Sequence, residues 1–428
     1  MNQFLTGSIP KEFQGYTDYA IDGTAYPTWA ERGHLTKMEI DDQNLPDLID
    51  LYANTDGTEK PLNFPKNSKI NAINASRPRY TKDPDALAGY RTASNDQPGS
   101  PYVGYEIHIL TNLPSIGSIV PHLIQSSTIV SAGSSRADAG IQTIDAFINA
   151  RQKAAAPPRK IICLVADRGY SMLRAETWQF RLWDRGIDQV FDLASVQRHP
   201  HPGPIPGTII IDGGVYTEAL PEILRDLPRA NQRGASKAEQ LRLAAQIDER
   251  ERFAFRPHGA RDPETGAQRW KGPALSGDLR CPNNTKSLRG PHNIPPTACK
   301  PGCACSKTFT WGPEDGARER QWPHFSTTKW LLSYRRRSAV ESVNAEIKTH
   351  RGDIKRGYTH VFGLSKNTIL MAFGFAATNI HILRDWHFNR HEQDPWSTQA
   401  DEEPWDFGIK PPQTRALRRK RIRDLIRT

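Results

Sequence analysis

The 428-residue chain lacks the features of membrane, secreted and disulfide-rich proteins. No apolar run reaches the roughly 18 residues that a membrane-spanning helix needs. The N-terminus has no basic flank leading into an apolar stretch, as a secretory signal would have. Five cysteines in so long a chain are no disulfide framework, and four of them cluster. We therefore expect a cytoplasmic protein with no membrane partner.

The charge of the chain is unevenly distributed. In total, 57 Lys and Arg residues oppose 47 Asp and Glu residues, which gives a net charge of +10. Residues 415–428 carry seven basic residues against one acidic residue, and residues 329–356 carry eight against three. Clusters of this kind are typical of proteins that bind a polyanion such as nucleic acid, although a basic end also suits a solubilising segment.

Hydrophobic periodicity predicts an α/β protein with a mixed sheet flanked by helices. We expect strands at 18–26, 103–110, 118–131, 160–166 and 189–193, a helix at 135–153, and helices again from 330 to about 387. The continuous apolar run at 160–166 indicates a strand buried on both faces. Residues 41–100 are polar and rich in Pro, Asn and Asp, which indicates a long irregular insertion.

Changes in composition divide the chain into four regions. Residues 1–194 form the first part of the α/β domain, and 195–325 form an insertion rich in Pro and Gly that we expect to be mostly β. Residues 326–390 supply the C-terminal helices of the α/β domain, and 391–428 form a basic C-terminal tail.

Three acidic residues stand where a metal site could form. Asp22 ends the first predicted strand, Asp167 ends the buried strand, and Glu341 lies on the helix that follows the insertion. A carboxylate just beyond a buried strand projects into the crevice where ligands collect in open α/β folds. Taken singly, Asp22 is equally compatible with a turn, and Asp167 with a cap at the strand end.

The helix after the insertion carries an unusual polar stripe. Tyr334, Arg337, Glu341 and Lys348 fall within about 60° of one another on an ideal helix, whereas Glu346 points away from that stripe. One interpretation is an exposed helix in which Arg337 and Glu341 form an i, i+4 ion pair. The other is a metal-binding carboxylate flanked by cations that hold phosphate.

The segment from Tyr334 to Lys348 resembles the Tyr-x2-Arg-x3-Glu-x6-Lys signature of DDE-type insertion-sequence transposases and matches it without a gap. Three other segments are similar to motifs of that group: Asp22-Gly23-Thr24, Asp167-Arg168-Gly169-Tyr170, and Asp83-Pro84-Asp85-Ala86 ahead of Gly104-Tyr105. The resemblance covers about residues 17–195 and 326–385, and the insertion and tail contribute little to it.

This resemblance implies an RNase H-like fold, with the insertion between the second Asp and the Glu helix. It implies that Asp22, Asp167 and Glu341 are catalytic and bind two Mg²⁺ ions about 3.5–4 Å apart, for which Mn²⁺ can substitute. Tyr334, Arg337 and Lys348 would bind the DNA strand near the cut. The expected activity is cleavage at transposon ends and strand transfer into target DNA. The expected partners are double-stranded DNA and a second copy of the chain bound with it, and the expected location is the bacterial or archaeal nucleoid.

Two alternatives stay open. One is a Mg²⁺-dependent DNA nuclease of the same fold that no longer transposes, and the other is a DNA-binding relic without chemistry. Such transposases usually carry an N-terminal helix-turn-helix domain, for which there is no room before Asp22. We therefore expect either an N-terminally truncated copy or recognition of the ends through the insertion and the tail.

Four cysteines of the insertion form a further candidate site. Cys281, Cys299, Cys303 and Cys305 could close a tetrahedral Zn²⁺ site, with His292 as a substitute ligand. Their spacing of x17, x3 and x1 is not that of a standard knuckle pair, so free cysteines in a loop remain the alternative. Asp212, which follows another β-branched run, stands beside two glycines and is best interpreted as a hairpin turn.

Overall fold

A computed structural model of the chain describes residues 1–30, 32–34, 79–81, 83–91, 99–150, 157–229, 234–262, 264–290, 297–313, 316–354 and 359–403. Most of the polar insertion predicted at 41–100, the possible ligand His292 and the cationic residues 415–428 lie outside the described residues.

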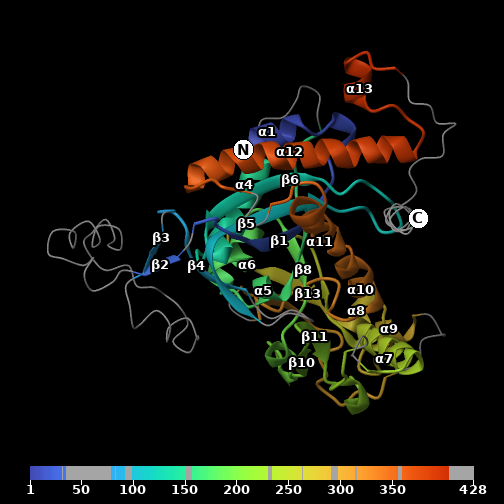
Figure 1. Ribbon diagram of the computed structural model, residues 1–428. Helices are drawn as coiled ribbons and strands as arrows, with labels where there is room; N and C mark the ends of the chain where they lie inside the picture. The colour runs from blue at the N-terminus through green and yellow to red at the C-terminus, as the bar shows by residue number, and fades with distance from the viewer. Residues whose placement is uncertain are drawn as a thin grey trace.

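The centre of the molecule is a mixed six-stranded sheet (Figure 1). Its strands are β1 (Asp18–Pro27), β4 (Leu87–Arg91), β5 (Ser100–Asn112), β6 (Ile124–Ser131), β7 (Cys163–Ala166) and β8 (Asp188–Phe191). The order is β4-β5-β1-β7-β8, and β6 also pairs with β5. Strand β5 runs antiparallel to β1, β4 and β6, whereas β7 is parallel to β1 and β8 is parallel to β7. The predicted mixed α/β fold is thus confirmed.

Alternation along β1 separates two hydrophobic cores. Tyr19 and Ile21 pack against one layer, which includes α4 (Arg136–Ile148), and Ala20 packs on the opposite face. That opposite face is covered by α10 (Thr328–Arg335), α11 (Ser338–Ala345) and α12 (Leu364–Asn389). In Figure 1 the long helix α12 crosses the sheet beside α1 (Asn2–Gly7). The sheet is therefore the middle of three layers.

Helix α4 begins where the sequence predicts it. Ser135 is the N-cap, and its side chain accepts a hydrogen bond from the backbone N–H of Asp138 at 3.2 Å. Ile141, Ile144 and Phe147 follow at helical spacing and are all buried. The N-cap and the apolar stripe therefore indicate the same helix. This helix packs on β5 and β6.

The segment from Tyr334 to Lys348 is not one ideal helix, and this part of the prediction is wrong. Helix α10 ends at Arg335, α11 begins at Ser338, and a π-helical turn follows at Glu346–His350 (η6). At the junction the N–H of Arg336 donates to Ser333 and that of Arg337 to Tyr334, which are i−3 bonds of a tightened turn. The guanidinium of Arg336 binds the Asp18 carboxylate at 2.6 Å, so a tertiary contact fixes this junction.

The insertion contains two small three-stranded sheets and a 14-residue helix, α7 (Lys237–Arg250), so the prediction that it is mostly β is wrong. The first sheet joins β9 (His201–Pro202), β10 (Thr208–Ile211) and β11 (Gly214–Thr217), and the second joins β12 (Arg256–Pro257), β13 (Gln268–Lys271) and β14 (Thr308–Trp311). Asp212 and Gly213 form the β10–β11 turn with φ of 51° and 75°. Asp212 accepts hydrogen bonds from Arg198 and Arg250, so its role is that of a buried ion-paired turn residue.

The remaining described elements are short. They are η1 (Lys11–Phe13), β2 (Arg32–His34), β3 (Arg79–Thr81), α5 (Arg168–Ser171), η2 (Ala175–Thr177), α6 (Gln179–Trp183), η3 (Ser195–Gln197), η4 (Glu222–Leu224), η5 (Glu251–Phe253), α8 (Pro273–Ser276), α9 (Thr285–Leu288) and α13 (Pro395–Gln399). None of the helices in the described ranges is long and apolar enough to cross a membrane.

Candidate active site

Asp22 and Asp167 occupy equivalent positions on the neighbouring parallel strands β1 and β7. Asp167 follows the last residue of β7, whereas Asp22 lies inside β1, which continues to Pro27, so the prediction that Asp22 ends its strand is wrong. The last register pair of β1 and β7 is Ile21 with Ala166, and the two aspartates come directly after it. Ala20 and Val165 belong to the core on the α11 side of the sheet. Because side chains alternate along a strand, both aspartates project toward that same side.

The Asp22 carboxyl is held between the sheet and α11. It accepts a hydrogen bond from the Asn344 side-chain amide at 2.9 Å and one from the Gly23 N–H at 3.0 Å. Burial raises the pKa of Asp22 to about 6, and the negative charge of Asp167 adds to this effect, against the opposing effect of Arg337. The folded chain thus concentrates negative charge at this position.

Asp167 has a structural bond of its own at the start of α5. Its side chain accepts a hydrogen bond from the Gly169 N–H at 2.8 Å and so caps the short helix. A side chain at Gly169 would collide with the guanidinium of Arg136, which reaches the site from α4. The charge of Arg136 acts on both Asp22 and Asp167. Glycine at position 169 therefore lets a cation approach the two carboxylates.

Glu341 lies on α11, one helical turn before Asn344, and its side chain is 54% exposed. It accepts a hydrogen bond from Arg337 at 2.5 Å, and Arg337 also interacts electrostatically with Asp22. Helix α11 thus places Glu341 in contact with Arg337, a cation whose charge also acts on Asp22. Among the described residues, the one group of three or more His, Cys, Asp or Glu with ligand atoms gathered around a common point is made of cysteines. A metal site shared by all three carboxylates therefore stays a prediction.

The other residues of the stripe line the same side of the sheet. Lys348 donates to the Thr24 hydroxyl of β1, two residues beyond Asp22. Burial, with a contribution from Arg91, lowers the pKa of Lys348 to about 8. Tyr334 stacks on Trp330 with ring centroids 4.6 Å apart, and burial raises its pKa to about 12.

Glu346 belongs to a different environment from Glu341. Its carboxylate accepts a hydrogen bond from Arg351 at 2.7 Å, and Arg351 also binds Asp385 of α12 at 2.5 Å. Glu346 therefore takes part in an ion-pair network that joins η6 to α12.

Sequence reasoning missed Asn344 and two polar side chains next to Gly23, those of Glu106 and His108. Asn344 could have been found as the residue one turn after Glu341, beside the edge of the predicted stripe. No sequence pattern identified Arg136, Glu106 or His108, which β5 and α4 bring together. Arg136 pairs with Glu106 at 3.3 Å, and burial lowers the pKa of His108 to about 3.

The donor atoms at this edge fit a hard divalent cation. Two carboxylates repel each other there, and the side-chain oxygen of Asn344 is buried without a hydrogen-bond partner. Carboxylate and amide oxygens are the ligands that Mg²⁺ and Mn²⁺ prefer. A bound cation would offset the repulsion between the carboxylates of Asp22 and Asp167, and it would give the side-chain oxygen of Asn344 a partner.

No protein-family model, curated protein or solved structure matches this chain.

Proposed function

We propose that the chain is a DDE-type transposase that cleaves DNA at transposon ends and joins the freed 3′ end to target DNA. The observation that carries the proposal is the placement of Asp22 and Asp167 directly after the last paired residues of the parallel strands β1 and β7, with Asp22 hydrogen-bonded to the helix that bears Glu341. The strand order β6-β5-β1-β7-β8, with β7 and β8 parallel to β1, supports an RNase H-like catalytic domain.

The chain's own residues would divide the work between metal binding and strand binding. Asp22, Asp167 and Glu341 would hold Mg²⁺, which supplies charge stabilisation for phosphoryl transfer when bound. Asn344 would orient Asp22 through its amide, as partners of metal ligands commonly do.

Arg337 and Lys348 would hold the DNA. Each is partly or largely buried beside Asp22, and phosphate is the natural partner of a cation at that position. Arg337 binds Glu341 in this structure, so binding of DNA and metal would redistribute its contacts. Tyr334 is stacked on Trp330, which fixes its ring beside Arg337.

Glu341→Gln and Glu346→Gln form a matched pair for the test, since both remove one carboxylate from the same helical segment. We expect Glu341→Gln to abolish Mg²⁺-dependent nicking of a duplex that carries the element's ends, while DNA binding changes little. Glu346→Gln should keep most of the activity because its carboxylate binds Arg351. Arg337→Ala and Lys348→Ala should lower activity partly through weaker DNA binding.

The assay separates the proposal from its alternatives. Cleavage followed by joining to target DNA supports a transposase. Cleavage without joining would indicate a nuclease, and DNA binding without cleavage in either Mg²⁺ or Mn²⁺ would indicate a relic. An active Glu341→Gln beside an inactive Glu346→Gln would refute the assignment of the signature.

A further inference from the structure

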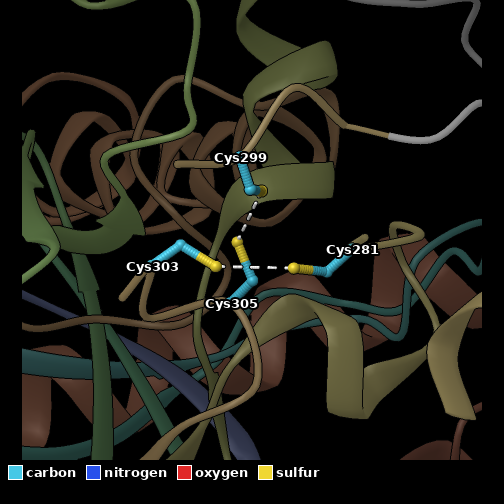
Figure 2. A group of neighbouring side chains, drawn as sticks. All are labelled: Cys281, Cys299, Cys303 and Cys305. Atoms are coloured by element: carbon cyan, nitrogen blue, oxygen red, sulfur yellow. Dashed lines mark hydrogen bonds between the residues drawn. The ribbon is translucent and has the colours of Figure 1, made fainter. Parts of the chain in front are cut away.

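The side chains of the four cysteines of the insertion converge on one point. None of them belongs to the carboxylate site described above. Cys281 follows α8, and the other three precede β14. Figure 2 shows all four side chains turned toward one another. Their sulfur atoms lie within 4.8 Å of one another, and the Cys281–Cys303 and Cys299–Cys305 sulfurs are each 3.4 Å apart.

We propose that Cys281, Cys299, Cys303 and Cys305 bind one structural Zn²⁺ ion. With zinc–sulfur bonds of about 2.3 Å, the sulfurs of a tetrahedral site lie about 3.8 Å apart. Two of the separations are 3.4 Å, close to that value, and all six pairs lie within 4.8 Å. The sulfurs therefore form one compact group of the size that a tetrahedral zinc site needs, rather than two isolated pairs.

Hydrogen-bond donors lie beside the sulfurs. The N–H of Asn283 donates to Cys281, and its side-chain amide donates to Cys303 at 3.4 Å. The N–H of Cys305 also donates to Cys303. Such donors would orient the sulfurs as second-sphere partners of metal ligands do.

The location of the cluster explains what zinc would stabilise. Cys281 and Cys305 are fully buried beside Leu279 and Ala274 in a small separate core. The Cys305 sulfur also lies 3.2 Å from the Thr217 hydroxyl, at the end of β11. The cysteines thus connect the loop after α8 to both small sheets of the insertion.

Such small cores gain stability from a metal crosslink. The sheets of the insertion have strands of only two to four residues, so a metal crosslink between their loops would add to the stability that their packing supplies. A Zn²⁺ ion with four protein ligands has no open position for substrate, so the site is structural rather than catalytic. Zinc is favoured over Mg²⁺ here because thiolates are soft ligands.

The test uses the full-length protein and the metal alone. Protein purified without chelator should contain about one zinc per chain by elemental analysis. Replacement with Co²⁺ should give the intense visible absorption of a tetrahedral thiolate complex. Cys299→Ser should lower the zinc content at least tenfold, whereas Cys163→Ser should retain it, since Cys163 lies in β7 of the central sheet.

The wild-type measurements alone keep the proposal falsifiable if Cys299→Ser does not fold. Four metal-free thiols, two disulfides detected by mass spectrometry, or stoichiometric iron in place of zinc would each overturn it. Zinc that persists in folded Cys299→Ser would do the same. None of these results depends on DNA cleavage, so the zinc site and the proposed activity can fail separately.

Discussion

Burial of Asp22 and its repulsion by Asp167 predict that removing this carboxylate stabilises the metal-free protein. Burial and the neighbouring Asp167 raise the pKa of Asp22 from its ordinary 3.8 to about 6. A carboxyl whose pKa is raised on folding favours the folded state only while it is protonated. That contribution is complete below pH 3.8 and is lost as the pH rises through about 6.

The size of the effect follows from the shift. Two pKa units correspond to about 3 kcal/mol, at about 1.4 kcal/mol per unit. Asp22 is only partly shielded from solvent, and replacing it by Asn weakens the hydrogen bond that the Asn344 amide donates to it. We therefore expect Asp22→Asn to raise the free energy of unfolding by about 1–3 kcal/mol. Asp22→Asn should therefore unfold at a higher urea concentration than the wild type at pH 7.

The assay compares urea unfolding of the two proteins in EDTA between pH 4.5 and 7.5, so that titrations common to both cancel. The free energy of unfolding of Asp22→Asn minus that of the wild type should increase as the pH rises to about 6, and it should then stay constant. Asp18→Asn is the matched control on the same strand, and it should destabilise because Asp18 binds Arg336 at 2.6 Å. A difference that is independent of pH, or Asp22→Asn less stable at pH 7 than at pH 4.5 relative to wild type, would refute the electrostatic argument.

Three further predictions concern other parts of the chain. Asn344→Ala should lower cleavage about 10–100-fold with DNA affinity unchanged, because it removes the bond that orients Asp22; equal loss of affinity would contradict this. Asp83→Asn should cost about 2–3 kcal/mol in urea unfolding, because the buried carboxylate accepts bonds from Thr28, Tyr105 and Gly363. Deleting residues 415–428 should weaken binding to all DNA sequences alike and flatten the dependence of log affinity on log salt. An unchanged slope would show that these residues do not contact phosphate.

The central sheet was predictable because local pattern and tertiary packing agree there. The alternation at 103–110 appears in β5, and the apolar run at 160–166 ends in the buried strand β7. Ser135 caps α4 as its sequence context predicts. Placement of Asp22 beside Asp167 then follows from the parallel pairing of β1 and β7, which the order of elements favours.

The geometry of the signature helix was not predictable from spacing. An ideal helix assigns 100° to every residue, but the turn at Arg336 is tightened and the turn at η6 is widened. The cause at Arg336 is a bond to Asp18, more than 300 residues away in sequence. Local periodicity carries no information about such a partner.

The same reasoning explains why the cysteine spacing alone left zinc undecided. Standard knuckles place two ligands on one tight turn, whereas here Cys281 reaches the other three across a 17-residue segment. The approach is set by the insertion's fold: the backbone at Gly272 passes so close to Cys305 that a side chain there would collide with its carbonyl. Cys281 then follows α8 into the same small core. A ligand set assembled by tertiary packing leaves no fixed spacing in the sequence, and only the fold can bring its members together.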